Sequence, residues 1–327
     1  MSASPFAGVM PSQAWRWFRN MLLLLLTWAA LGASANTLIL TTADTYGVSN
    51  LLKEFDNPGS PGGAPGRVMQ GALSSANGIS AATFADAPGP YDLVVVYSVY
   101  STVDATNWAV LQDAANRRLA NAFVFFVDGC AQCRANVNSF IPFLNTATGL
   151  NMSVGINQQS GPLNFALNTT SPYQANFQGL NPLTGGYVSY IDSVPYANTL
   201  YLPAGVAPTT PAPTSSTPTT AFGVLFPQTM VNSGQGACIF GVLDATIFDS
   251  SFGYASGKNP GKIAPAFQAA AAAGSTSCQV IVAPDVTSVS SPVPVAVPTT
   301  GTWSLLALSL SLLMAGLRRQ ALRSKFR

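Results

Sequence analysis

Two cysteines separated by two residues form the first motif that could do chemistry, Cys130-Ala131-Gln132-Cys133. The motif follows a predicted buried strand and opens a predicted helix. Because a helix N-terminus stabilises a thiolate, the first thiol is expected to have a lowered pKa, which would suit thiol-disulfide exchange. The alternative, which we favour, is a structural disulfide or loop clamp, as is common in exported proteins.

Three aspartates form a second candidate set: Asp44, Asp128 and Asp244 each come at the end of a predicted strand. In a parallel sheet all three would stand at the carboxyl edge, where α/β proteins bind ligands. Their oxygens could hold Ca²⁺ or Mg²⁺, or two of them could share a proton for acid–base work. The simpler interpretation is that each aspartate caps the next helix or turn.

The chain contains no histidine. This excludes a Ser-His-Asp triad, a Cys-His pair and a His-ligated zinc site, because each needs an imidazole as base or ligand. An enzyme built on this sequence would have to use carboxylates, Cys, Lys or Tyr. We therefore predict no catalytic residues, no metal and no cofactor, and favour a non-catalytic binding or structural protein over an oxidoreductase or a carboxylate-based hydrolase.

Alternating strands and helices are expected to position these residues. Uninterrupted apolar runs at 91–97 and 122–127 are typical of parallel strands buried on both faces, and 37–42 is a further β-rich run. The pattern predicts an α/β fold, a flavodoxin-like three-layer sandwich with a mostly parallel sheet. The predicted helices are 48–55, 104–119, 130–144 and 264–273, with a weaker one at 68–76, and the later strands are 198–202, 222–226, 237–243 and 279–282.

Two stretches lack a clear period. Residues 146–189 are rich in Asn, Gln and Gly and are expected to form loops and short strands, and the Pro/Thr-rich segment 207–220 is expected to be a mobile linker or a long exposed loop. Four cysteines in an exported chain suggest two disulfides. The simplest pairing is Cys130 with Cys133 and Cys238 with Cys278, although four cysteines allow three pairings.

Residues 1–35 have the pattern of a secretory signal peptide. Arg16 and Arg19 precede an apolar run at 21–31, and Ala33-Ser34-Ala35 supplies the small residues that signal peptidase requires. We predict cleavage before Asn36, with an uncleaved anchor as the alternative. The exported α/β domain would then span 36–285, followed by a Pro/Ser/Val-rich spacer at 286–296.

Residues 297–327 combine a short motif, an apolar run at 304–317 and a basic tail. This order is typical of a membrane-targeting address, with the basic end kept in the cytoplasm. The residues that carry the pattern are Val297, Pro298, Thr299, Thr300, Trp303, Arg318 and Arg319.

The segment resembles the IPTL-CTERM sorting signals, relatives of the PEP-CTERM signals that exosortase-type membrane proteases process. Pro298, Thr299 and Trp303 match the family spacing, whereas Val297 replaces Ile and Thr300 replaces Leu. The resemblance implies a single hydrophobic helix, an exosortase-like sorting protease as partner, and a final place in the cell envelope or at the cell surface. A plain membrane anchor is the alternative.

The spacing of the predicted strands and the loop after Leu144 resemble class I glutamine amidotransferase-like domains, including their trehalose-utilisation branch. Their Gly-x-Cys-x-Gly nucleophile motif is missing here, as is the histidine, so the resemblance implies a non-catalytic relative. The domain at 36–285 has seven basic and twelve acidic residues, a net charge of −5. A nucleic-acid partner is therefore not expected, because phosphates require a clustered basic surface.

Overall fold

The computed structural model describes residues 36–55, 67–85, 91–130, 133–209, 212–254, 259–272 and 274–279. The predicted signal peptide, the spacer at 286–296 and the sorting segment at 297–327 lie outside these ranges. No helix within the described ranges is both long and apolar enough to cross a bilayer.

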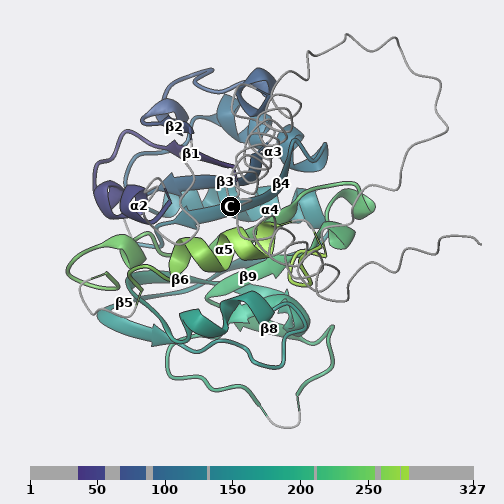
Figure 1. The fold of residues 1–327 in the computed structure, drawn as a ribbon. Helices are drawn as coiled ribbons and strands as arrows, with labels where there is room; N and C mark the ends of the chain where they lie inside the picture. Colours follow the sequence, from purple (N-terminus) through teal and green to yellow (C-terminus); the bar gives the residue numbers. More distant parts are fainter. Residues whose placement is uncertain are drawn as a thin grey trace, which may run out of the picture. The chain divides into compact units, whose positions relative to one another are not determined.

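Seven strands form the larger sheet, in the order β2-β1-β3-β4-β10-β9-β7 (Figure 1). The first five are parallel, and β9 runs antiparallel to both β10 and β7. The parallel part has the order 2-1-3-4-5 when β10 is counted as the fifth strand, consistent with a flavodoxin-like fold. The strands are β1 (Thr37–Thr41), β2 (Arg67–Met69), β3 (Tyr91–Ser98), β4 (Ala120–Val127), β7 (Thr199–Tyr201), β9 (Gly223–Phe226) and β10 (Cys238–Val242).

Helices cover both faces of this sheet, which confirms the mixed α/β architecture. One apolar cluster joins the sheet to α2 (Val48–Phe55) and α5 (Ile263–Ala271), and a second joins its other face to α3 (Ala105–Asn116) and α4 (Arg134–Thr148). Alternate residues of each central strand enter opposite clusters, as the pleat requires. Uninterrupted apolar strands are stable here because both faces are covered.

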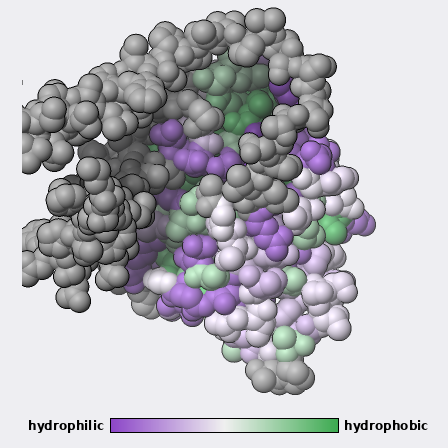
Figure 2. Space-filling view, turned by 45° about the vertical axis from the view of Figure 1, so that its right-hand side comes forward, coloured by the Kyte–Doolittle hydropathy of each residue, from purple (hydrophilic) through white to green (hydrophobic). Residues whose placement is uncertain are grey.

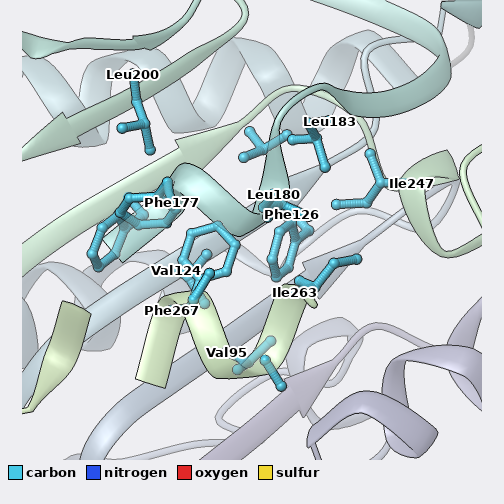
Figure 3. Packing of buried hydrophobic residues seen from close by; sticks show 14 of the residues in the cluster. Val95, Val124, Phe126, Phe177, Leu180, Leu183, Leu200, Ile247, Ile263 and Phe267 are labelled. Atoms are coloured by element: carbon cyan, nitrogen blue, oxygen red, sulfur yellow. The ribbon is translucent and has the colours of Figure 1, made fainter. Parts of the chain in front are cut away.

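The first cluster is packed with aromatic rings. Figure 3 shows Phe267 of α5 beside Phe126 of β4, and their ring centroids lie 5.4 Å apart in an edge-to-face arrangement. Phe177 packs against Phe267 at 5.2 Å from the short 3-10 helix η4 (Ala175–Leu180). Such pairs stabilise a core beyond the area that they bury.

A smaller antiparallel sheet is the main departure from the predicted fold. It contains β5 (Ser153–Phe165), β6 (Leu183–Pro195) and β8 (Pro218–Ala221). The prediction of loops and short strands at 146–189 was therefore wrong for two long strands. Their glycines and polar residues weaken the usual strand signal, and the register shifts of the β5–β6 pair interrupt strict alternation.

Three further predictions need correction. The weak helix at 68–76 is instead the end of β2, a turn and one 3-10 turn, and Gly71 in that turn has a left-handed φ of 73°. The segment 207–220 ends in β8, so part of it is paired. Gln279 lies in a turn, and the rest of the strand predicted at 279–282 falls outside the described residues. The 3-10 turn within 68–76 is η1 (Ala72–Ser74). Further 3-10 turns are η2 (Ala81–Phe84), η5 (Tyr196–Asn198), η6 (Gln228–Met230), η7 (Asn232–Gly234) and η8 (Thr246–Phe248).

Both disulfides of the simplest pairing are formed. Cys238 at the start of β10 is bonded to Cys278, 40 residues later in the chain and beyond α5, and both are fully buried. Cys130 is bonded to Cys133, the N-cap residue of α4.

Figure 2 shows one face of the molecule, where polar and weakly polar residues alternate with small apolar patches. Solubility of such a surface depends on uncharged polar groups.

Candidate ligand-binding edge

The parallel strands bring the three predicted aspartates to one edge of the sheet. Asp44 follows β1, Asp128 follows β4 directly, and Asp244 follows β10. Because these strands are parallel, their carboxyl ends meet at the same edge. We call these three residues the acidic edge. The strand order reverses between β1 and β3, which is where open α/β sheets form a ligand crevice.

The side chain of Asp244 links the two sheets through hydrogen bonds. Its side chain is fully buried, and Oδ2 accepts a hydrogen bond of 2.8 Å from the backbone N–H of Gly186 in β6. Its Oδ1 accepts bonds from the N–H of Thr246, at 2.6 Å, and from the Thr246 hydroxyl. This is the capping role that the sequence left open for all three aspartates. Asp244 therefore fastens β6 across the end of β10.

Strand β6 closes the edge at this end. The Ser189 N–H donates to the carbonyl of Leu243 at 3.3 Å, and the Ser189 hydroxyl donates to the carbonyl of Gly129 at 2.9 Å. A Cβ on Gly185 would lie 1.9 Å from Oδ2 of Asp244, so only glycine permits this approach. The accessible part of the acidic edge is consequently the end of β1 and β3.

Asp44 lies at that accessible end and is half-buried. Its oxygens accept a hydrogen bond of 2.7 Å from the N–H of Ser101 and one of 2.9 Å from the Ser101 hydroxyl. The Thr42 hydroxyl donates a third, at 3.0 Å. Asp44 thus ties the loop after β1 to the loop after β3 and remains partly open to solvent.

Asp128 lies between the other two and is 1% exposed. The pKa of its carboxyl is raised from 3.8 to about 7, mainly by burial and also by the charge of Asp44, against the lowering effect of backbone hydrogen bonds from Cys130 and Gly129. The Cys130 bond is 2.9 Å long and again has the form of a turn cap. Burial, followed by the charge of Asp128, also raises the pKa of Asp244. Asp244 therefore favours its protonated form at neutral pH, whereas Asp128 changes its protonation state near pH 7.

Tyrosines lie around the open end, and no sequence motif predicted them. The phenol of Tyr100 is close enough to Asp128, Tyr187, Asp249 and Asp44 for each to raise its pKa, after burial as the main cause. Tyr46 and Tyr100 pack edge to face at 6.0 Å. Tyr100 is 54% exposed and Tyr187 is 40% exposed, so both rings face solvent. We call Tyr46, Tyr100 and Tyr187 the tyrosine rim.

Tyr97 holds the tyrosine rim in place through a hydrogen bond to the backbone of Tyr46. It is fully buried at the end of β3, and its hydroxyl donates to the carbonyl of Tyr46 at 2.7 Å. Burial, with the nearby charges of Asp128 and Asp244, raises the pKa of Tyr97, so it stays un-ionised. An apolar strand alone predicts Tyr97 as a core residue; its hydroxyl bond to the next loop requires the tertiary structure.

The Cys130–Cys133 disulfide adjoins Asp128. Cys130 is 5% exposed and Cys133 is 1% exposed. A carboxylate oxygen of Asp128 and the two sulfur atoms all lie within 4.8 Å of one another. The N–H of Cys133 also approaches Sγ of Cys130 at 3.1 Å. The two motifs that the sequence singled out separately therefore form one cluster.

A hollow of about 270 Å³ lies between η4 and α5 and contains none of these residues. Lys262 is the one charged residue in its lining. This hollow brings together no group of acidic or aromatic side chains, so the acidic edge is the better candidate. The lining residues are Asn176, Gly179, Leu180, Gly261, Lys262, Pro265 and Ala266.

No family model and no curated protein matches the chain. Among solved structures, a ThuA-like protein from Parabacteroides merdae is similar over 64% of this chain and 78% of its own, with 17% sequence identity and a TM-score of 0.34. Similarity at this level transfers neither a site nor an activity.

Proposed function

We propose that this chain is an exported envelope protein that binds a ligand, without transforming it, at the end of β1 and β3. The observation that carries the proposal is the position of Asp44 and the exposed Tyr100 together at the point where the strand order reverses. A half-buried carboxylate beside exposed aromatic rings provides both hydrogen-bond acceptors and stacking surfaces.

The chemistry of the edge favours a neutral, hydroxyl-rich ligand such as an oligosaccharide. Carboxylate oxygens accept hydrogen bonds from hydroxyl groups, and tyrosine rings pack against the apolar face of a sugar ring. Anionic ligands are disfavoured, because the charge of Asp44 repels them and the groups that shift the pKa of Asp128 include no cation.

A carboxylate-based hydrolase is less well supported. Such an enzyme needs one carboxyl group as acid and a second as base or nucleophile. Asp244 is enclosed by hydrogen bonds from β6 and the following turn, and Asp44 accepts three hydrogen bonds from its own loops. Asp128 alone has the pKa of a general acid.

We also propose that the domain is exported and sorted as the termini suggest. Signal peptidase would cleave before Asn36, and an exosortase-like protease would process the segment beginning at Val297. The two disulfides support an oxidising compartment, where such bonds persist. Binding at the edge would then take place outside the cell, with the membrane as the site of attachment.

Binding can be tested by calorimetry on the purified full-length protein, with neutral tetrasaccharides and polygalacturonate as probes. We expect a neutral oligosaccharide to bind and the polyanion not to bind. Tyr100→Ala should weaken binding about tenfold, since a stacked ring is lost. Asp113→Asn, on an exposed α3 carboxylate, is the matched control for Asp44→Asn. Equal affinity of wild type and Tyr100→Ala, or binding to none of the neutral probes, would overturn the proposal.

A further inference from the structure

The Cys130–Cys133 disulfide differs from the second disulfide in its surroundings. Cys238 and Cys278 are both fully buried among apolar residues. The Cys130–Cys133 pair instead lies at the start of α4, slightly exposed through Cys130, with the Asp128 carboxyl group within 4.8 Å of both sulfur atoms. One disulfide has a proton donor beside it, and the other serves as an internal reference.

We infer that the Cys130–Cys133 pair is a redox-active disulfide that thiols of the envelope reduce, and that the Asp128 carboxyl group supplies the proton for the departing sulfur. This inference stands apart from the ligand-binding proposal, although both concern the same edge.

The reaction begins at Cys130, the more exposed of the two sulfurs. A thiolate of a small-molecule thiol or of a dithiol protein attacks Sγ of Cys130, a mixed disulfide forms, and the bond to Cys133 breaks. The electron pair moves to Sγ of Cys133, which takes the proton of Asp128 directly after a small side-chain rotation or through one water.

A second thiolate then attacks the partner sulfur of the mixed disulfide and releases Cys130 as a thiolate. Two thiolates are oxidised to one disulfide, and the protein disulfide is reduced to one thiolate and one thiol. The Cys133 N–H, 3.1 Å from Sγ of Cys130, and the N-terminus of α4 stabilise that thiolate.

The pH window of the step follows from the groups that face Asp128. Asp128 must be protonated to act, so its pKa of about 7 sets the upper limit. The neighbouring carboxyl group of Asp44 raises that pKa, and the tyrosines have pKa values raised above 10, so they stay neutral throughout. The titratable groups that interact with Asp128 are Asp44, Asp244, Tyr46, Tyr97 and Tyr100.

The test is reduction of the full-length protein by dithiothreitol between pH 5 and 9, with maleimide trapping and peptide mass spectrometry. Cys130–Cys133 should open under native conditions while Cys238–Cys278 stays closed. The rate per dithiothreitol thiolate should fall about tenfold per pH unit above 7, as expected for loss of one catalytic proton. Asp128→Asn should abolish this fall, and Asp44→Asn should move it to lower pH.

Parallel reduction of both disulfides would overturn the inference, as would an Asp128→Asn profile that falls in the same way as wild type. If Asp128→Asn does not fold, wild type is compared with Asp44→Asn. A wild-type rate that does not fall above pH 7, or a fall at the same pH in Asp44→Asn, would contradict the role of Asp128 as proton donor. No ligand is used, so failure here leaves the binding proposal untouched, and failure to bind sugars leaves this one untouched.

Discussion

At the scale of single residues, one type of side chain has two different roles. Asp244 is enclosed and hydrogen-bonded, so it stabilises the junction of the sheets, whereas Asp44 stays half-buried at the end of β1. The partners produce this difference: β6 is hydrogen-bonded to the segments after β4 and β10, whereas Asp44 is held by the loops after β1 and β3. The proposed binding at this edge therefore depends on the carboxylate that stays half-buried, Asp44.

The buried aspartates predict an unusual pH dependence of stability. Because burial raises the pKa of Asp128 to about 7, the folded state holds a proton that the unfolded chain loses above its ordinary pKa of 3.8. The free energy of unfolding should therefore fall as pH rises from about 4 to 7 and level off above, by roughly 4 kcal/mol for this group. Asp244 contributes in the same direction.

Urea unfolding at several pH values measures this. Asp128→Asn should flatten the slope and unfold at higher urea than wild type at pH 8, because no charge is then buried. Asp113→Asn, on an exposed carboxylate, should leave the slope unchanged. Stability that is constant or rises from pH 5 to 8 would contradict the buried, protonated state.

The sequence predicted the aspartates but not the tyrosines. Asp44, Asp128 and Asp244 follow strands, and a parallel sheet brings strand ends together by rule, so their shared edge could be read directly. Tyr100 and Tyr187 come from a loop and from β6, and only tertiary structure places them together. The fate of Asp244 was equally hidden, because its partner Gly186 lies in a segment without a strand signal.

At the scale of elements, the junction between β6 and β10 is the most sensitive contact. A Cβ at Gly185 would lie 1.9 Å from Oδ2 of Asp244, so Gly185→Ala must displace the strand or the carboxyl group. We expect a loss of about 2 kcal/mol or more in the free energy of unfolding. Gly179→Ala is the control, since no atom lies within 4 Å of its Cβ position. Equal stability of the two variants in urea would show that the junction is loose.

The two disulfides should differ in their effect on stability. Cys238–Cys278 closes a loop of 40 residues, and chain-entropy estimates give about 4 kcal/mol for such a loop. Cys130–Cys133, with a separation of 3, should contribute about half as much. Paired Cys→Ser variants unfolded in guanidinium test this order. A larger loss from removing Cys130–Cys133 would assign that disulfide the main structural role and weaken its redox assignment.

The central sheet could be predicted more fully than the second one. The apolar runs of β3 and β4 have no exposed face and therefore no ambiguity, and the Asp104 cap marks the start of α3 by a hydrogen bond of 2.8 Å to the Thr106 N–H. Strands β5 and β6 carry glycines because Asp244 and Phe252 occupy the space where side chains would be. From composition alone these glycines predict a loop, because the sequence does not show that Asp244 and Phe252 pack against them.

At the scale of the whole molecule, a folded α/β domain lies between two predicted addressing segments. The domain supplies an acidic edge, a tyrosine rim and two disulfides, and the termini are expected to deliver it to the envelope. The two disulfides suit an oxidising compartment, where such bonds persist. The charge of −5 at 36–285 suits neither nucleic acid nor an anionic membrane surface as a partner.

Export of an oxidised domain is the claim on which the other proposals depend, and intact-protein mass spectrometry of the native membrane fraction tests it most directly. We predict a mass that begins at Asn36, reflects two disulfides and ends near Thr299, with Pro298→Ala retaining the tail. A chain that keeps its N-terminal segment and contains four free thiols would contradict the account.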